Sequence, residues 1–154
     1  MTHGRILVAI DLGPATEAVI AAGAVLAGRC GTAISLLHVV EPDPEFVGFD
    51  VGPASVRHQL AEVYRREHAT IQGHAGKLRA QGFDAEGLLI QGSAGQKILD
   101  EVVRLDVLYV VVGSHDRSVA GLLRGSTSKF LSQNAHVPVV LVPRPSGVPP
   151  ADGA

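Results

Sequence analysis

The residues with the clearest capacity for chemistry lie between positions 107 and 127, in the stretch VLYVVVGSHDRSVAGLLRGST. This stretch begins as an apolar run, breaks at Gly113-Ser114, and reaches Gly125-Ser126-Thr127 just before another helical pattern. Glycine lets a ligand approach the backbone closely, and the amino end of a helix offers unpaired N–H groups and partial positive charge. This arrangement is typical of α/β proteins that hold a phosphate at the end of a strand.

Asp116, in the middle of this stretch, works against a bound phosphate. A carboxylate about 5 Å from a phosphate oxygen, at an effective dielectric near 20, costs roughly 3 kcal/mol, or about a hundredfold in affinity. Solvent screening would reduce this cost, a bridging Mg²⁺ would reverse its sign, and Arg117 or Arg124 would offset it. The sequence therefore leaves open an occupied phosphate site and an empty or remodelled one.

The remaining reactive side chains indicate no evident catalytic machinery. The sequence shows no Ser-His-acid order or pair of carboxylates, and the histidines lack the i, i+4 spacing of a helical zinc site. His58, His68 and His74 fall on a helix face that is expected to be solvated. His38 lies in an apolar strand, where its hydrogen bonds are expected to be satisfied within the core. His115 stands beside the phosphate stretch without an evident nucleophile.

The elements that must position these residues follow from hydrophobic periodicity. Short runs rich in aliphatic residues predict strands, and apolar residues spaced three or four positions apart predict helices between them. Strands that alternate with helices indicate an α/β fold, in which helices cover both faces of a parallel sheet. The predicted strands are residues 5–10, 33–40, 85–91, 107–112 and 137–142.

Four helices are expected between these strands. The first begins near Pro14 or Thr16, and the fourth covers residues 126–134. The second is the longest and follows a Pro-, Gly- and Asp-rich segment at residues 41–54, which is expected to be a mobile loop. The third is expected to present Ile98, Val102 and Leu105 on one face. The expected apolar face of the second helix consists of Val56, Leu60, Val63, Ile71, Ala75 and Leu78.

Composition limits the class of function. The 154 residues include 46% hydrophobic and 18% charged residues, as expected of one compact domain, here residues 1–143 with a flexible tail at 144–154. The net charge of −2 and the absence of tryptophan argue against nonspecific nucleic-acid binding and base stacking. No apolar run could span a membrane, no signal peptide is evident, and the single cysteine, Cys30, suits a reducing compartment. The cytoplasm is the expected location.

Several polar or glycine residues fall at the ends of the predicted strands. Asp11 follows the first strand, Val39-Val40 end the second, and Gly113-Ser114 follow the fourth. Open parallel sheets bind ligands outside the carboxyl ends of their strands, at the point where the strand order reverses. These residues are therefore expected to line one crevice.

Four features together resemble the universal stress protein family. The first strand ends in Asp11, the second contains LLHVV, the fourth runs into GSH, and the later GS precedes a helix and the strand VPVVLVP. The resemblance covers residues 4–143. It implies a Rossmann-like sheet of five parallel strands in the order 3-2-1-4-5.

The nucleotide-binding branch of that family carries Gly-x-x-Gly, then nine residues, then Gly-(Ser/Thr). Gly113, Gly125 and Ser126 match this motif. Asp116 replaces the second glycine, and eight residues rather than nine separate it from Gly125.

The resemblance extends to the adenosine part of the ligand. It places Asp11 where the family's aspartate contacts the adenosine of ATP, and Val39 where backbone groups face the adenine. Ribose and adenine contacts therefore carry over more directly than phosphate contacts.

The resemblance implies a stress-response protein that binds ATP or AMP, with or without Mg²⁺, in a crevice between the first and fourth strands. Binding would alter contacts with an unidentified protein partner. The expected nucleotide-binding residues are Ala9, Ile10, Asp11, Val39, Val112, Gly113, Ser114, His115, Asp116, Gly125, Ser126 and Thr127.

Other interpretations of these residues remain open. Asp11 would serve only to cap the first helix or its turn, and Ser126-Thr127 would be only an N-cap pair. At the level of function, the alternatives are a nucleotide-free dimeric interaction module and a slow Mg²⁺-dependent ATPase. In the ATPase, Asp11 and Asp116 are the candidates for holding the metal and the water.

The last predicted strand suggests how two copies would associate. Val137 to Val142 form an apolar segment without charge, expected at a sheet edge that can pair with another chain. Pro138 and Pro143 limit its length, which suits a short symmetric contact. The resemblance likewise implies a homodimer through this strand; the alternative is an edge covered by the chain's own tail.

Overall fold

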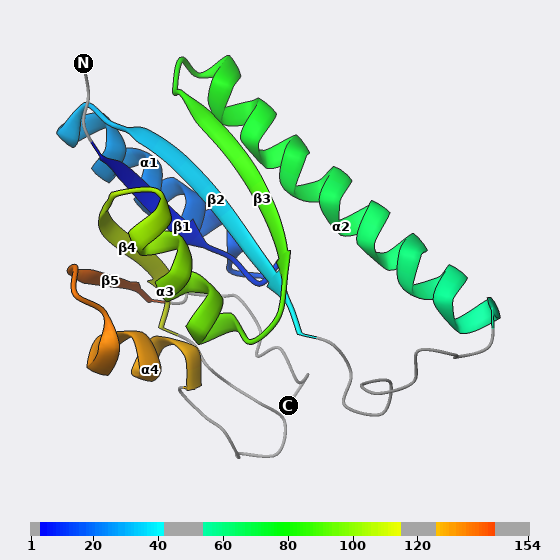
Figure 1. Ribbon diagram of the computed structural model, residues 1–154. Coiled ribbons are helices and arrows are strands. Elements are labelled where there is room, and N and C mark those ends of the chain that lie inside the picture. Colours follow the sequence, from blue (N-terminus) through cyan, green and yellow to red (C-terminus); the bar gives the residue numbers. More distant parts are fainter. Residues whose placement is uncertain (1–3, 42–53, 115–125, 144–154) are drawn as a thin grey trace.

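The structure is a computed structural model that describes residues 4–41, 54–114 and 126–143, without the side chains of residues 54–57 and 126. Five parallel strands form one sheet in the order β3-β2-β1-β4-β5, which confirms the α/β class and the order implied by the sequence (Figure 1). The elements are β1 (Arg5–Ala9), α1 (Thr16–Cys30), β2 (Ala33–Val40), α2 (Ala54–Ala80), β3 (Ala85–Gln91), α3 (Ala94–Arg104), β4 (Val107–Gly113), α4 (Ser126–Asn134) and β5 (Val139–Val142).

The central strand β1 is buried on both faces, which explains its unbroken apolar sequence. Ile6, Leu7 and Val8 have no exposed surface, although successive side chains point to opposite sides of the sheet. Ile6 and Val8 belong to one core cluster, and Leu7 belongs to the other. A strand covered on both sides cannot alternate apolar and polar residues, so the run is continuous.

The helices divide between the two faces as right-handed crossovers require. α1 and α2 pack against one core cluster, to which they contribute side chains such as Val19 and Ile71. α3 and α4 pack against the other, contributing Ile98 and Leu131, and lie in front of the sheet in Figure 1. The chain proceeds from β1 through β2 to β3 and then crosses back to β4. The strand order therefore reverses between β1 and β4.

The long helix α2 differs from the sequence expectation at its amino-terminal half. Ile71, Ala75 and Leu78 are buried as expected, but Leu60 and Val63 are 42% and 38% exposed. A helix of 27 residues is about 40 Å long, whereas the seven-residue strand β3 covers about 23 Å. The first turns of α2 therefore extend past the sheet, and the apolar face has no strand to pack against there (Figure 1).

Three strand boundaries also differ from the prediction, and one of them is at β4, which ends at Gly113 rather than Val112. β5 begins at Val139 rather than Val137, because Pro138 has no N–H to donate to a neighbouring strand; its carbonyl accepts from Val110 N instead (3.0 Å). β1 ends at Ala9, one residue before the expected Ile10. The expected tail at 144–154, and all of the expected loop at 41–54 except its two ends, lie outside the described residues.

A polar group joins three strands near their amino ends. The Arg5 guanidinium donates to Ser35 Oγ and to Glu86 Oε1, each at 2.8 Å, and Ser35 Oγ donates to the same carboxylate at 2.8 Å. Ser35 is fully buried, so this pairing satisfies a hydroxyl that would otherwise destabilise the core. The amino edge of the sheet is therefore tied together by structural interactions.

Two glycines inside helices are predicted to respond oppositely to alanine. A Cβ at Gly23 of α1 would lie 2.4 Å from Val8 Cγ2, whereas a Cβ at Gly73 of α2 would meet nothing within 4 Å. We expect Gly23→Ala to destabilise the protein by about 1–3 kcal/mol through overpacking, and Gly73→Ala to stabilise it by about 0.5–1 kcal/mol through helix propensity. Urea unfolding of the two variants measures this, and equal effects would contradict the close packing of α1 on β1.

Candidate functional site

The carboxyl edge of the sheet brings together residues from three neighbouring strands. Val8 of β1 pairs with Leu36 of β2 on one side and with Val111 of β4 on the other. When this register is extended by three residues, Asp11 lies level with Val39 and Ser114. The sequence-predicted residues of the first, second and fourth strands therefore lie along one edge, where the strand order reverses.

Asp11 shapes the turn that leads from β1 into α1. Its Oδ1 accepts a hydrogen bond from Gly13 N at 2.8 Å, and Gly13 O accepts one from Thr16 N at 3.1 Å. Leu12 adopts a positive φ of 61°, and α1 has no side-chain hydrogen bond at its N-cap. The structure thus confirms that Asp11 caps this turn. Asp11 is exposed at the sheet edge.

The ends of β2 and β4 are held by backbone bonds to their neighbours. Gly92 N donates to Val40 O at 3.0 Å, and Ser114 N donates to Val142 O at 2.9 Å. Val112 is buried, while Val39 and Gly113 are half-buried and remain partly accessible at the edge. The backbone at this edge is therefore ordered by the sheet rather than by a ligand.

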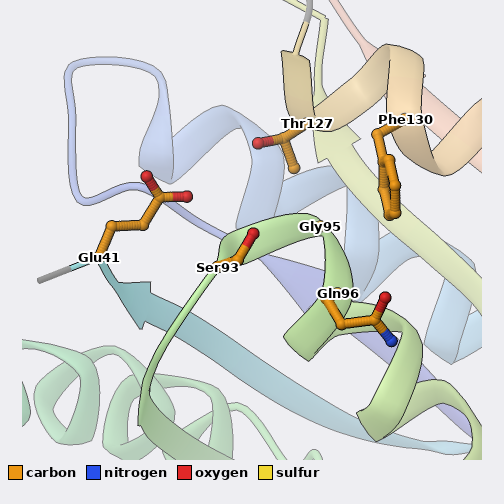
Figure 2. Close-up of a pocket in the computed structure, with 6 residues that line it drawn as sticks. All are labelled: Glu41, Ser93, Gly95, Gln96, Thr127 and Phe130. Carbon is orange, nitrogen blue, oxygen red and sulfur yellow. The ribbon is translucent and has the colours of Figure 1, made fainter.

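A cavity of about 380 Å³ opens beside this edge, between the amino ends of α3 and α4 (Figure 2). Thr127 and Phe130 project into it from α4, opposite Ser93 and Gly95 at the start of α3. A Cβ at Gly95 would lie 2.5 Å from the Phe130 ring, so glycine is required for this close approach of the two helices. The full lining is Glu41, Ser93, Gly95, Gln96, Thr127 and Phe130.

Glu41 contributes a carboxylate to the cavity and also caps α3. Its Oε1 accepts from Ala94 N at 3.0 Å, across 53 residues of sequence. Negative charge at a helix amino end is favourable, because the first N–H groups are unpaired and carry partial positive charge. The amino end of α3 is therefore already occupied by this carboxylate. The cavity thus presents one acid, two hydroxyls, an amide and an aromatic face.

The structure brings only part of the predicted site to this cavity. Of the predicted residues, Thr127 lines it, and α4 begins at Ser126 as expected. His115, Asp116 and Gly125 lie outside the described residues.

Sequence reasoning missed the other lining residues. The turn that leads from β3 into α3, which begins at Ala94, forms one wall of the cavity through Ser93 and Gly95. The only sequence signal for this wall was the small residue type of Ser93 and Gly95. Glu41 carried no signal, because its partner is distant in the sequence.

Two structural searches bear on other functions. Within residues 4–41, 54–114 and 126–143, no group of three or more His, Cys, Asp or Glu side chains could hold a metal ion. In the same part of the chain, no helix has the length and apolar character needed to cross a membrane.

The fold is an open parallel α/β sheet whose strand order reverses between β1 and β4, the position at which proteins of this class bind ligands. The model of the universal stress protein family matches residues 2–143, so the chain belongs to that family. Universal stress protein A of Salmonella typhimurium is 26% identical over 145 residues, which cover 93% of this chain and 96% of the relative.

Two solved structures of similar fold carry ligands. An Arabidopsis thaliana family protein with AMP bound is 18% identical, with a TM-score of 0.67 and 97% of each chain covered. The universal stress protein of Archaeoglobus fulgidus in complex with dAMP is 19% identical, with a TM-score of 0.62, covering 92% of this chain and 99% of that one. Both support the fold assignment.

Proposed function

We propose that the protein binds an adenine nucleotide, ATP or AMP with or without Mg²⁺, in the crevice at the carboxyl ends of β1 and β4. The observation that carries the proposal is the register that sets Asp11 level with Val39 and Ser114 where the strand order reverses. Two family members hold AMP and dAMP, which supports the same ligand class here.

The charges at this edge favour one orientation of the ligand. The Glu41 carboxylate stands at the start of α3, so an anionic group is disfavoured beside it. The amino end of α4 follows Gly125 and carries hydroxyl residues, which suits phosphate. The adenosine therefore lies toward β1 and β2, with Asp11 on the ribose and the Val39 backbone on the adenine, and the phosphates point toward α4.

The cellular role follows from binding rather than from chemistry. Nucleotide binding changes a surface that a protein partner recognises, and the segments at 41–54 and 116–124 contribute to that surface. A ligand shifts such an equilibrium only through contacts that differ between the two states, and both segments border the proposed crevice in sequence. The protein acts in the stress response as a nucleotide-dependent binding protein.

Asp11→Asn is predicted to weaken AMP binding by about tenfold, because it removes a charged acceptor for the ribose hydroxyls. The asparagine Oδ1 can still accept from Gly13 N, so the turn is preserved. Titration calorimetry with AMP and with ATP–Mg²⁺ measures the change.

Asp84→Asn is the matched control, since Asp84 is an exposed aspartate that precedes β3 at the opposite edge of the sheet. It should leave the affinity unchanged. Failure of the wild-type protein to bind either nucleotide at millimolar concentration would exclude the proposed function.

Asp116→Gly is predicted to tighten ATP binding by up to about a hundredfold, because it removes a carboxylate from the expected phosphate loop. AMP, with fewer phosphates, should gain less. The ratio of ATP to AMP affinity in wild type and variant measures this effect. An unchanged ratio would show that Asp116 does not oppose the phosphates.

We also propose a homodimer that forms across β5, which is the last strand of the sheet and exposes 48% of Leu141. Leu141→Asp is predicted to shift the protein to monomer, because charge opposes pairing of an apolar edge. Sedimentation velocity at tens of micromolar tests this, with the 81% exposed Val103 of α3 replaced by Asp as a control. A wild-type protein that sediments only as a monomer would contradict the dimer.

A further inference from the structure

His38 connects the proposed nucleotide site to α2 through both nitrogens of its ring. Nδ1 lies 2.9 Å from the carbonyl oxygen of Ile10, and Nε2 lies 3.2 Å from Oε2 of Glu67. The ring is 12% exposed and the Glu67 side chain 31% exposed, so the pair lies partly within the protein. The sequence had placed His38 in the core with its bonds satisfied, and it gave no indication of either partner.

The chemistry of the partners fixes the position of the proton on Nδ1. A backbone carbonyl only accepts, so His38 Nδ1 must carry a hydrogen and donate it to Ile10 O. The contact of Nε2 with the carboxyl group of Glu67 needs one more proton, held either on the ring or on the carboxyl group. Without that proton, two lone pairs would face each other. The ring is thus held in one orientation from both sides.

The bond to Ile10 acts on the residue that precedes Asp11. Ile10 lies one position beyond the end of β1, and its N–H donates to Leu37 O at 2.9 Å. The His38 ring contacts the carbonyl of the same residue, so residues of β2 hold both the N–H and the carbonyl group of Ile10. The chain changes direction immediately afterwards, at Leu12 with its φ of 61°. The held backbone of Ile10 therefore sets the direction of the chain at Asp11.

We propose that His38 is a positioning residue, which holds the carboxyl end of β1 so that Asp11 and the Val39 backbone face the same ligand. Glu67 holds the ring from α2. The inference rests on the proposed nucleotide binding, and it names a residue that itself does not touch the ligand. The Glu67 carboxyl group is the ionisable group that contacts the ring, and the Asp11 carboxylate accepts from Gly13 N. Tyr64 stands one turn before Glu67, and burial, followed by the Glu67 carboxylate, raises the pKa of Tyr64.

The histidine side-chain ¹⁵N spectrum of the nucleotide-free protein tests the ring state directly. We expect His38 Nδ1 to show the shift of a protonated nitrogen, because it donates to the carbonyl oxygen of Ile10. Glu67→Ala should weaken this signature, since the ring loses its second anchor. A His38 ring that is protonated only on Nε2 would overturn the inference.

Two substitutions of His38 separate its two bonds. His38→Asn carries an amide nitrogen near the position of Nδ1 and can retain the bond to Ile10, so we expect AMP affinity close to that of the wild type. His38→Gln carries its amide near Nε2 and loses that bond, so we expect about tenfold weaker AMP binding. His58→Gln is the matched control, because His58 faces Glu62 at 3.9 Å on the protruding half of α2.

The outcomes distinguish this inference from the proposed function. If the wild-type protein binds AMP and His38→Gln binds it equally well, the inference is wrong and the proposed function stands. If the wild-type protein binds no adenine nucleotide, both fail. Unfolding midpoints of the two variants show whether a loss of affinity reflects a loss of the fold: equal midpoints with unequal affinities are the expected result, and affinity that follows stability would overturn the positioning role.

Discussion

The parallel pairing of β1 with β2 on one side and β4 on the other is the constraint on which the rest of the structure depends. It buries Ile6, Leu7 and Val8 completely and so requires helices on both faces. Because each crossover is right-handed, α1 and α2 take one face and α3 and α4 the other. The helices that follow β1 and β4 therefore lie on opposite faces, and the carboxyl edge between these two strands is where this fold can accept a ligand.

Long-range polar contacts adapt this edge to a particular geometry. Glu41 caps α3 across 53 residues, and His38 joins Ile10 to Glu67. Each contact joins a residue near the carboxyl end of a strand to a helix that is distant in the sequence. Burying the His38 ring would be unfavourable without partners, so its contacts both stabilise the fold and help to set the direction of the residues at the edge.

The sequence predicted the five strands, the helices between them and the residues at the carboxyl ends, because a doubly covered sheet leaves continuous apolar runs. It predicted burial wrongly where a helix extends past the sheet, as at Leu60 and Val63 of α2. Hydrophobic periodicity identifies an apolar face but not the element that covers it. The family resemblance was confirmed by the match to residues 2–143.

For the candidate site, the sequence named Asp11, Val39 and Thr127, of which Thr127 lines the cavity, but it did not name the cavity wall at α3. Glu41 and Glu67 could not be found, since their partners are defined only by three-dimensional proximity.

An NMR titration of the ¹⁵N-labelled protein with AMP tests the central claim most directly. The account predicts shifts at Asp11, Val39 and Gly113, with Gly31, Gly82 and Asp106 at the opposite edge unchanged. Shifts confined to that opposite edge, or no shifts at millimolar AMP, would contradict it.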